Sequence, residues 1–241
     1  MSNLFVEIES AQQQKALAID QILFEHYGGP FNFFSTKDAL SEMVSALLSH
    51  RTKNAVSGKA YRDLRAILPT WEEVMNAPTE MVFEAIKIVT YPEVKAARIQ
   101  NALKDIKELN NGELTLDFIK DWPVEQSRNW LEKIPGIGVK TSAAILNFSH
   151  LRLPALVVDT HHLRVGQRLG IVPSNCTLDK GSRLMESYLP EDWDGQRMYD
   201  NHQAFMRHGQ KVCHWRHPNC KSCIVRDYCL HYEQNYQAAN I

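Results

Sequence analysis

The sequence predicts an all-α protein, and three observations support that fold class. Apolar residues recur at helical spacing in nearly every segment, and helix caps or glycine and proline breaks separate one segment from the next. No pair of alternating strands joined by a hairpin turn is evident. At 241 residues, of which 44% are hydrophobic, the chain can form one large or two small domains with a real core. No apolar run approaches the length that spans a bilayer, so no membrane partner is expected.

The helices of the first half follow from these signals in order. Residues 11–24 form the first helix, and the Gly-Gly-Pro sequence at residues 28–30 then breaks the chain and marks a boundary. Ser35 or Thr36 is expected to cap the next helix, which carries an apolar stripe from Leu40 to Leu48. The later helices of this half are expected at residues 54–68, at a short segment opened by the capping-box pattern Thr70–Glu73, at residues 78–89, and along a stripe from Ala96 to Ile106 that ends near Gly112.

The second half contains a glycine turn between two helices. Gly136 and Gly138 flank Ile137, which permits unusual backbone angles and lets another backbone come close. The N–H groups of such a turn and of the helix start after it form a natural site for a phosphate oxygen, so these three residues are candidate DNA contacts. Helices of this half are expected at residues 124–134, 139–148, 160–169, 181–188 and 193–210.

Four of the five cysteines lie in the last thirty residues, spaced C-x6-C-x2-C-x5-C. They are Cys213, Cys220, Cys223 and Cys229. The chain starts with no apolar signal segment, so a cytosolic, reducing compartment is expected and clustered thiolates indicate metal rather than disulfides. Zinc sites tend to use two CxxC pairs and this tail has one, but the spacing alone leaves zinc and an iron–sulfur cluster both open. Cys176 has no partner in the pattern and is expected to be a free structural thiol.

The charge distribution is more informative than the net charge. Lys and Arg total 27 against 28 acidic residues, a net charge of −1, which by itself argues mildly against DNA binding. Residues 160–178 and 205–226, however, contain basic residues and no Asp or Glu. We therefore expect a basic face that contacts DNA phosphates, with an ordinary solvated surface as the alternative. Its candidate contacts are Arg164, Lys211 and Arg216.

Two short strings and the cysteine spacing resemble a known family. IPGIGVKT at residues 134–141, followed by VDTH at residues 158–161, resembles the helix-hairpin-helix DNA glycosylases, most closely the endonuclease III branch. The cysteine spacing is similar to the 4Fe–4S loop of that branch, so the resemblance implies an iron–sulfur cofactor. It also implies a six-helix domain at residues 31–149 that ends in the hairpin. Residues 1–30 and 150–241 would form a second, cluster-bearing domain, with DNA in the cleft between the two.

The resemblance assigns the chemistry to Lys140 and Asp159. A neutral, partly buried Lys140 amine would attack C1′ of the sugar, form a Schiff base and cut the strand by β-elimination. The Asp159 carboxylate would stabilise positive charge on the sugar and help to move a proton. The alternatives are an exposed or phosphate-binding lysine and an aspartate that only caps a helix. His161 is expected to pack beside its helix or contact phosphate rather than to act as an acid or base.

Two loops depart from the family's pattern. Arg51 stands where relatives commonly have glutamine, and Thr90 lies near a usual leucine. Arg51 could still fill the space left by an everted base, since its guanidinium is planar and stacks, although an ordinary charged loop is the alternative. Tyr91 fits either a core residue or a stacking platform. These departures leave the preferred lesion and opposite base open.

The resemblance implies a monomeric, cytoplasmic or nucleoid-associated enzyme that acts on double-stranded DNA with a damaged base or an abasic site. It would be a bifunctional DNA glycosylase and abasic-site lyase that excises damaged pyrimidines in base excision repair, and oxidised pyrimidines are the expected substrates. One alternative is a mismatch-specific or modified-base-specific relative, although monofunctional relatives usually lack a lysine at position 140. Another is a non-catalytic DNA-binding or redox module, which would need neither the lysine nor the aspartate.

Overall fold

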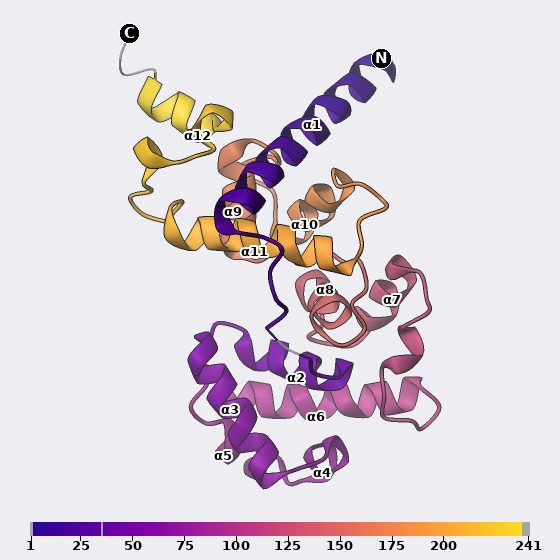
Figure 1. Cartoon of the computed structure of the whole chain (residues 1–241). Helices are drawn as coiled ribbons and strands as arrows, with labels where there is room; N and C mark the ends of the chain where they lie inside the picture. The colour runs from indigo at the N-terminus through magenta and orange to yellow at the C-terminus, as the bar shows by residue number, and fades with distance from the viewer. Residues whose placement is uncertain (1, 35, 238–241) are drawn as a thin grey trace. The chain divides into compact units, whose positions relative to one another are not determined.

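The computed structural model is all-helical, which confirms the predicted fold class. It describes residues 2–34 and 36–237, and no β-strand occurs among them (Figure 1). The chain forms two compact units, which we call the terminal unit (residues 1–33 and 154–241) and the central unit (residues 34–153). Within the described part of the chain, no helix is both long enough and apolar enough to cross a bilayer.

The boundaries between the units lie after residues 33 and 153, whereas the sequence placed them after residues 30 and 149. Local contacts explain the difference. The Phe31 N–H donates to Asp200 Oδ1 (2.8 Å), and the Phe33 ring stacks on Tyr199 with centroids 4.1 Å apart, so these residues belong to the terminal unit. The Leu153 N–H donates to the Leu146 carbonyl (2.9 Å), which keeps residues up to 153 in the central unit.

The central unit is built around α2, which packs against α3, α6 and α8, while α5 packs against both α3 and α6. Its fully buried side chains include Met43, Leu47, Ile86, Ile99 and Leu103. Each such side chain contributes roughly 1.5–3 kcal/mol when it leaves water. The helices of this unit are α2 (Ala39–Ser49), α3 (Asn54–Ile67), α4 (Trp71–Asn76), α5 (Thr79–Ile86), α6 (Pro92–Leu109), the 3₁₀ turn η1 (Asp117–Ile119), α7 (Val124–Leu131) and α8 (Val139–Phe148).

Two helix starts test the capping predictions. The capping box is confirmed, because the Glu73 N–H donates to Thr70 Oγ1 (3.1 Å) and the Thr70 N–H donates to Glu73 Oε2 (2.7 Å). The predicted cap of α2 is wrong: Asp38 caps it, accepting from the Ser41 N–H at 2.8 Å. The helix begins later than expected, so Thr36 precedes the cap, and Ser35 lies outside the described residues.

The terminal unit is built around α11, which packs against α1 and α9 (Figure 1). Ile19 and Leu23 of α1 are fully buried, and the buried Asp20 carboxylate pairs with Arg197 and accepts from Asn201 Nδ2 (2.8 Å). The helices of this unit are α1 (Ser2–Tyr27), α9 (Thr160–Leu169), α10 (Leu178–Ser187), α11 (Gly195–Lys211), the turns η2 (Cys220–Ser222) and η3 (Arg226–Tyr228), α12 (Leu230–Tyr232) and η4 (Glu233–Gln237).

Candidate active site and cysteine-lined cavity

The hairpin between α7 and α8 has the backbone that its glycines predict. Gly136 has a φ of +95°, in the region that favours glycine, and the Ile137 N–H donates to the Ile134 carbonyl (3.0 Å). Gly138 is extended and caps α8, accepting at its carbonyl from the Thr141 N–H (2.9 Å). The Ile137 side chain is only 3% exposed, so it anchors the turn in the core, and the contact of this residue with DNA stays a prediction.

The two hairpin glycines differ in the space around them. A Cβ at Gly136 would lie 2.5 Å from Arg98 Cδ, whereas a Cβ at Gly138 would meet nothing within 4 Å. The open side of Gly138 lies at the start of α8, where the N–H groups that precede Thr141 have no intrahelical acceptor. The arrangement is therefore suited to an anion that approaches the backbone at Gly138.

Lys140 lies in this first turn of α8 and is half-buried. The next residue, Thr141, has its Oγ1 3.1 Å from His50 Nε2, which ties the start of α8 to the loop after α2. Burial, together with the charges of Lys140, Lys95 and Arg98, lowers the pKa of His50 to about 4. His50 is therefore a neutral partner at neutral pH.

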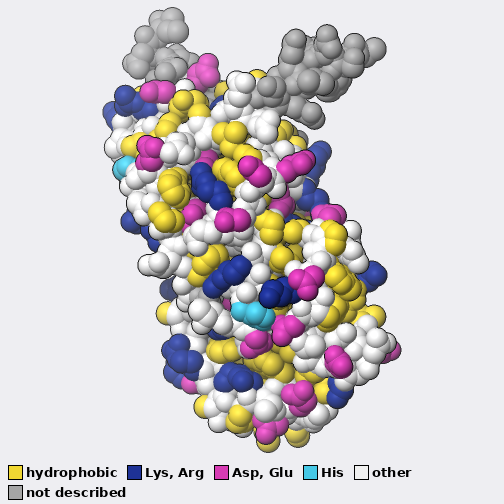
Figure 2. Space-filling model, turned by 45° about the vertical axis from the view of Figure 1, so that its right-hand side comes forward, with side chains coloured by type: hydrophobic (Ala, Val, Ile, Leu, Met, Phe, Trp, Pro, Cys, Tyr) yellow, Lys and Arg dark blue, Asp and Glu magenta, His cyan; other side chains and the backbone are white. Residues whose placement is uncertain are grey.

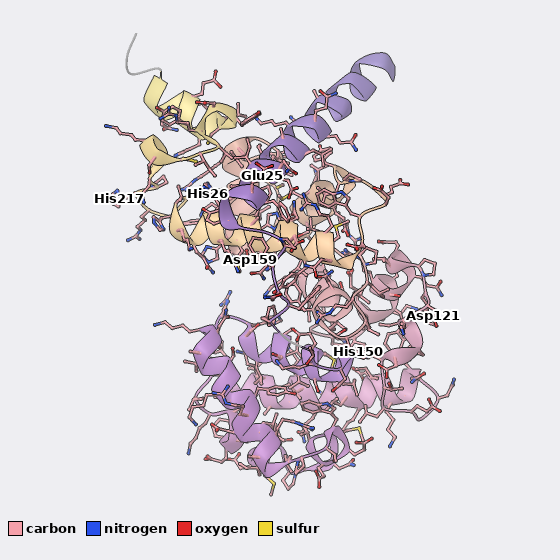
Figure 3. All side chains as sticks on the ribbon, in the orientation of Figure 1. Glu25, His26, Asp121, His150, Asp159 and His217 are labelled. Carbon is pink, nitrogen blue, oxygen red and sulfur yellow. The ribbon has the colours of Figure 1, made fainter. Side chains whose placement is uncertain are left out.

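Asp159 caps α9 and is half-buried, with Oδ1 accepting from the His162 N–H at 2.8 Å (Figure 3). Burial acts to raise the pKa of Asp159, but His202 and the His162 N–H outweigh it, so the pKa lies below its usual value. The carboxylate is thus charged at neutral pH and has a defined direction. Lys140 belongs to the central unit and Asp159 to the terminal unit.

The loops that carry Arg51 and Thr90 are joined to each other. Thr90 Oγ1 donates to the Arg51 carbonyl (2.9 Å), and the Thr90 N–H donates to Thr52 Oγ1 (3.1 Å). Arg51 and Thr90 are exposed, as is Tyr91 at 54%, which removes the core alternative for Tyr91. Arg51 and Tyr91 have φ values of 53° and 56°, in the left-handed region that a side chain disfavours.

The remaining predicted DNA contacts fall into two groups. Lys211 and Arg216 are exposed, so their contact with DNA stays a prediction. Arg164 is only 8% exposed, and its guanidinium donates to the carbonyls of Gly209 (2.8 Å) and Cys213 (3.0 Å). His161 Nδ1 lies 3.1 Å from the same guanidinium. Arg164 and His161 therefore hold the end of α11. The sequence did not indicate this role for Arg164, whereas packing was one of the two roles expected for His161.

Acidic and basic side chains are interspersed on one face of the protein (Figure 2). On the face that Figure 2 shows, Lys and Arg lie among Asp and Glu, with hydrophobic side chains between them. The predicted basic face is therefore not the one in this view.

All four cysteines of the predicted cluster loop line one cavity in the terminal unit. Arg168 Nη1 donates to Cys213 Sγ (3.3 Å), and the same group donates to the His214 carbonyl (2.6 Å). The rest of the lining is largely apolar and includes Val165, Leu169 and Val212. Among the residues that the structure describes, no three His, Cys, Asp or Glu side chains are grouped as ligands of a single metal ion. Cys176 does not line this cavity.

Among the buried charges of the central unit that the sequence analysis missed are Lys95 and Glu42, each 4% exposed. A signal existed for both. Lys95 is one turn before Ile99 on the apolar stripe of α6, and Glu42 lies inside the apolar run of α2. A charge in such a position is either buried or at the edge of the core.

The chain resembles proteins of known families along most of its length. The family described as HhH-GPD superfamily base excision DNA repair protein matches residues 44–191. Endonuclease III of Escherichia coli K12 is 28% identical over 220 residues, which covers 91% of this chain and 97% of that protein. Endonuclease III of Thermotoga maritima is 28% identical over 197 residues and covers 82% and 85%. A relative from Arabidopsis thaliana is 28% identical over 192 residues, and the chain spans 61% of that longer protein.

Solved structures share the fold. A trapped endonuclease III–DNA covalent intermediate superposes with a TM-score of 0.77 at 21% identity, over 92% of this chain and 97% of that one. A thermostable thymine-DNA glycosylase superposes with a TM-score of 0.76 at 19% identity, over 93% and 99%. The predicted family and the predicted enzyme class, a DNA glycosylase, are confirmed. The chain belongs to the HhH-GPD superfamily of base excision DNA repair proteins, and within it the chain resembles endonuclease III.

Proposed function

We propose that the chain is a bifunctional glycosylase and abasic-site lyase that removes oxidised pyrimidines from double-stranded DNA. The observation that carries the proposal is Lys140 in the first turn of α8, directly after a hairpin whose Gly138 side is open. A phosphate bound at that backbone would bring the sugar of a neighbouring nucleotide toward the lysine. The pyrimidine preference rests on the likeness of the hairpin and the VDTH motif to the endonuclease III branch.

In the proposed reaction the neutral Lys140 amine attacks C1′ of an everted nucleotide. The C1′–N bond breaks, and the base leaves with the electron pair and takes up a proton. The lone pair of the lysine nitrogen then forms a C1′=N double bond as the C1′–O4′ bond breaks and O4′ takes up a proton, which opens the sugar to a protonated Schiff base. Removal of a C2′ proton then expels the 3′ phosphate by β-elimination, which cuts the strand and leaves the imine to be hydrolysed.

Asp159 supplies the fixed negative charge in this scheme. Its carboxylate would stabilise the positive charge that develops at C1′ as the base departs, and would accept the proton that the attacking amine loses. A helix cap is a good place for such a group, because the bond from the His162 N–H sets the direction of one oxygen and leaves the other available. The cap and the catalytic role are thus compatible.

A 4Fe–4S cluster is the cofactor we propose for the cavity at the end of α11. Four cysteines around a largely apolar cavity, with Arg168 donating to the Cys213 sulfur, fit a four-thiolate cluster. Burial raises the pKa of Cys223 to about 11, so iron would have to displace that proton to bind the thiolate. When bound, the cluster would hold the loop that carries Arg216 in one conformation rather than take part in the reaction.

The proposed partner is duplex DNA that contains a damaged base or an abasic site, bound by a single copy of the chain. The backbone at Gly136 and Gly138 and the side chains of Lys211 and Arg216 would contact phosphates, and Arg51 would fill the space of the everted base. Such an enzyme would work in the compartment that holds the DNA, the cytoplasm and nucleoid if the cell is prokaryotic.

Borohydride trapping tests the lysine. Duplexes with an oxidised pyrimidine, a mismatched thymine, 8-oxoguanine or an abasic site are incubated with saturating protein and borohydride, which reduces an imine to a stable cross-link. We expect trapping on the oxidised-pyrimidine and abasic duplexes and its loss in Lys140→Ala, while Lys133→Ala, an exposed lysine of the same hairpin, still traps. Absence of trapping on every duplex would refute the lyase, and trapping by Lys140→Ala would refute the residue assignment.

A matched pair of caps tests Asp159. Asparagine keeps the cap but removes the charge, so Asp159→Asn is expected to lower the single-turnover excision rate about a hundredfold without lowering the Tm. Asp194 caps α11 in the same way, accepting from the Arg197 N–H at 2.8 Å, so Asp194→Asn is the control and keeps its rate. Equal excision rates for the two variants would mean that Asp159 only caps α9 and has no role in catalysis.

A further inference from the structure

Lys95 is a buried lysine with a complete set of hydrogen bonds. It lies in the first turn of α6, and its Nζ donates to the carbonyls of Leu48 (2.7 Å) and His50 (2.7 Å) and to Thr52 Oγ1 (2.9 Å). Burial lowers the pKa of Lys95 to about 8, with a further contribution from Arg98, so the ammonium is still mostly charged at neutral pH. A charged donor in this setting makes stronger hydrogen bonds than a neutral one.

Thr52 extends these bonds to a second loop. Its Oγ1 accepts from Lys95 and also from the Thr90 N–H (3.1 Å), and Thr90 Oγ1 returns a bond to the Arg51 carbonyl (2.9 Å). We call Lys95, Thr52 and Thr90 together the Lys95 clamp. The clamp connects the loop after α2 with the loop before α6, which are otherwise separated by three helices in the chain.

The two tips that the clamp holds have the same unusual backbone. Arg51 and Tyr91 are both exposed and both left-handed, although each has a Cβ that disfavours this conformation. Such a conformation persists only where surrounding bonds impose it. The clamp supplies these bonds on either side of Arg51, at the His50 carbonyl, the Arg51 carbonyl and the Thr52 hydroxyl.

The same region of α6 also reaches the hairpin. His50, whose carbonyl Lys95 holds, has its Nε2 3.1 Å from Thr141 Oγ1, next to Lys140. Arg98, one turn after Lys95, lies against Gly136 of the hairpin. A continuous set of contacts within the central unit thus runs from the two loop tips to the first turn of α8.

We propose that Lys95 is a positioning residue that sets the two loop tips, Arg51 and Tyr91, as one rigid wedge at a fixed place relative to Lys140. This inference rests on the proposed function, because a wedge is needed only if a nucleotide leaves the duplex. The tips enter the stack together, and the clamp keeps them from relaxing to the conformations that their side chains favour. Lys95 itself touches neither the base nor the sugar.

The test uses the full-length protein and a duplex with 2-aminopurine next to the lesion, because this base becomes fluorescent when it unstacks. Lys95→Met is expected to lose the fluorescence rise on binding, and to excise an oxidised pyrimidine about a hundredfold more slowly because the wedge is misplaced. On a duplex with an abasic site the loss of rate is expected to be smaller, since no base has to leave the stack. Lys104→Met, at an exposed lysine of the same helix, is the control.

A second pair guards against a variant that does not fold. Thr52→Val is nearly isosteric but cannot accept from Lys95 or Thr90, whereas Thr52→Ser keeps the hydroxyl. Thr52→Val should reproduce the loss of fluorescence, and Thr52→Ser should restore it. The inference is overturned if Lys95→Met and Thr52→Val bind with the wild-type fluorescence rise, or if both slow the two duplexes equally. The fluorescence rise requires DNA binding but no chemical step. It therefore tests the Lys95 clamp even if the wild-type protein traps no duplex, a result that would refute only the proposed lyase activity.

Discussion

At the scale of single residues, Glu42 shows how an ionisable group can be buried at a cost to stability. It is 4% exposed in α2, and its Oε2 has no hydrogen-bond partner among the described residues. Burial raises the pKa of this carboxyl to about 7, although Lys37, Arg152 and Lys140 act to lower it. The folded protein therefore holds a proton on Glu42 that the unfolded chain releases near pH 4.5.

We expect the substitution Glu42→Gln to stabilise the protein in a pH-dependent way. Below about pH 4.5 Glu42 is protonated in both the folded and the unfolded wild type, so the stability that the proton provides is fully present. Between about pH 4.5 and pH 7 the unfolded state has lost its proton while the folded state still keeps it, so over this range the wild type loses up to roughly 3 kcal/mol of stability that glutamine keeps. Thermal unfolding should show equal Tm values at pH 4.5 and a higher Tm for Glu42→Gln at pH 8.

The control for this measurement is Glu108→Gln, at an exposed glutamate near the end of α6. Its Tm difference from the wild type should not grow between pH 4.5 and pH 8. A Glu42→Gln difference that is constant over the same range would mean that the folded carboxyl titrates like an exposed one.

At the scale of elements, the two glycines of the hairpin have different roles. Gly136 is required by the fold, because its φ of +95° is one that other residues avoid. Gly138 has an extended backbone that any residue can adopt, and nothing lies within 4 Å of a Cβ there. What glycine provides at this second position is open space on the outside of the turn.

Alanine substitutions should separate these two roles. Gly136→Ala is expected to lower the free energy of unfolding by about 1–2 kcal/mol or more, since the left-handed backbone is retained against its Cβ. Gly138→Ala is expected to unfold like the wild type but to bind duplex DNA more weakly, because its methyl group occupies the space of the proposed phosphate. Thermal unfolding measures the stability of each variant, and a DNA titration at fixed salt measures its affinity. An unchanged DNA affinity in Gly138→Ala would refute the proposed phosphate contact at this turn.

At the scale of the whole molecule, each unit has its own core, and the cysteine loop belongs to one of them. The cavity that the four cysteines line is closed by α9 and the end of α11, both in the terminal unit. Arg164 and Arg168 connect α9 to the same loop through the carbonyls of Cys213 and His214. Loss of a metal centre from this cavity should therefore loosen the terminal unit and leave the central core intact.

Replacement of one ligand tests this expectation. Cys220→Ser is expected to contain little iron or sulfide and to lose its brown colour, while Cys176→Ser, a thiol outside the cavity, keeps both. Hydrogen exchange should become faster in α9 and α11 of Cys220→Ser and stay slow in α2 and α6. Stoichiometric zinc in a colourless wild-type protein would refute the cluster.

Local chemistry made most helices predictable. The capping box at Thr70 and Glu73 and the helix over Val139–Phe148 appear where the sequence placed them. The cap of α2 was wrong because several neighbouring polar residues can accept the same hydrogen bond, and Asp38 caps this helix in place of Thr36. The bounds of α1 also differ, since this helix extends beyond the predicted residues 11–24. A cap needs only one oxygen near free N–H groups, so neighbouring polar residues compete for it.

The sequence by itself determined the helical fold class, the hairpin, the candidate lysine and aspartate, and the cysteine loop, because each depends on residues close together in the chain. Only the tertiary structure decided which charges are buried. Lys95 meets Leu48 and Thr52 from more than forty residues away, and Arg164 meets the Cys213 carbonyl across the separation of α9 and α11. Spacing along the chain cannot encode such partners, since they are selected by the packing of whole helices and by the need to satisfy every buried donor.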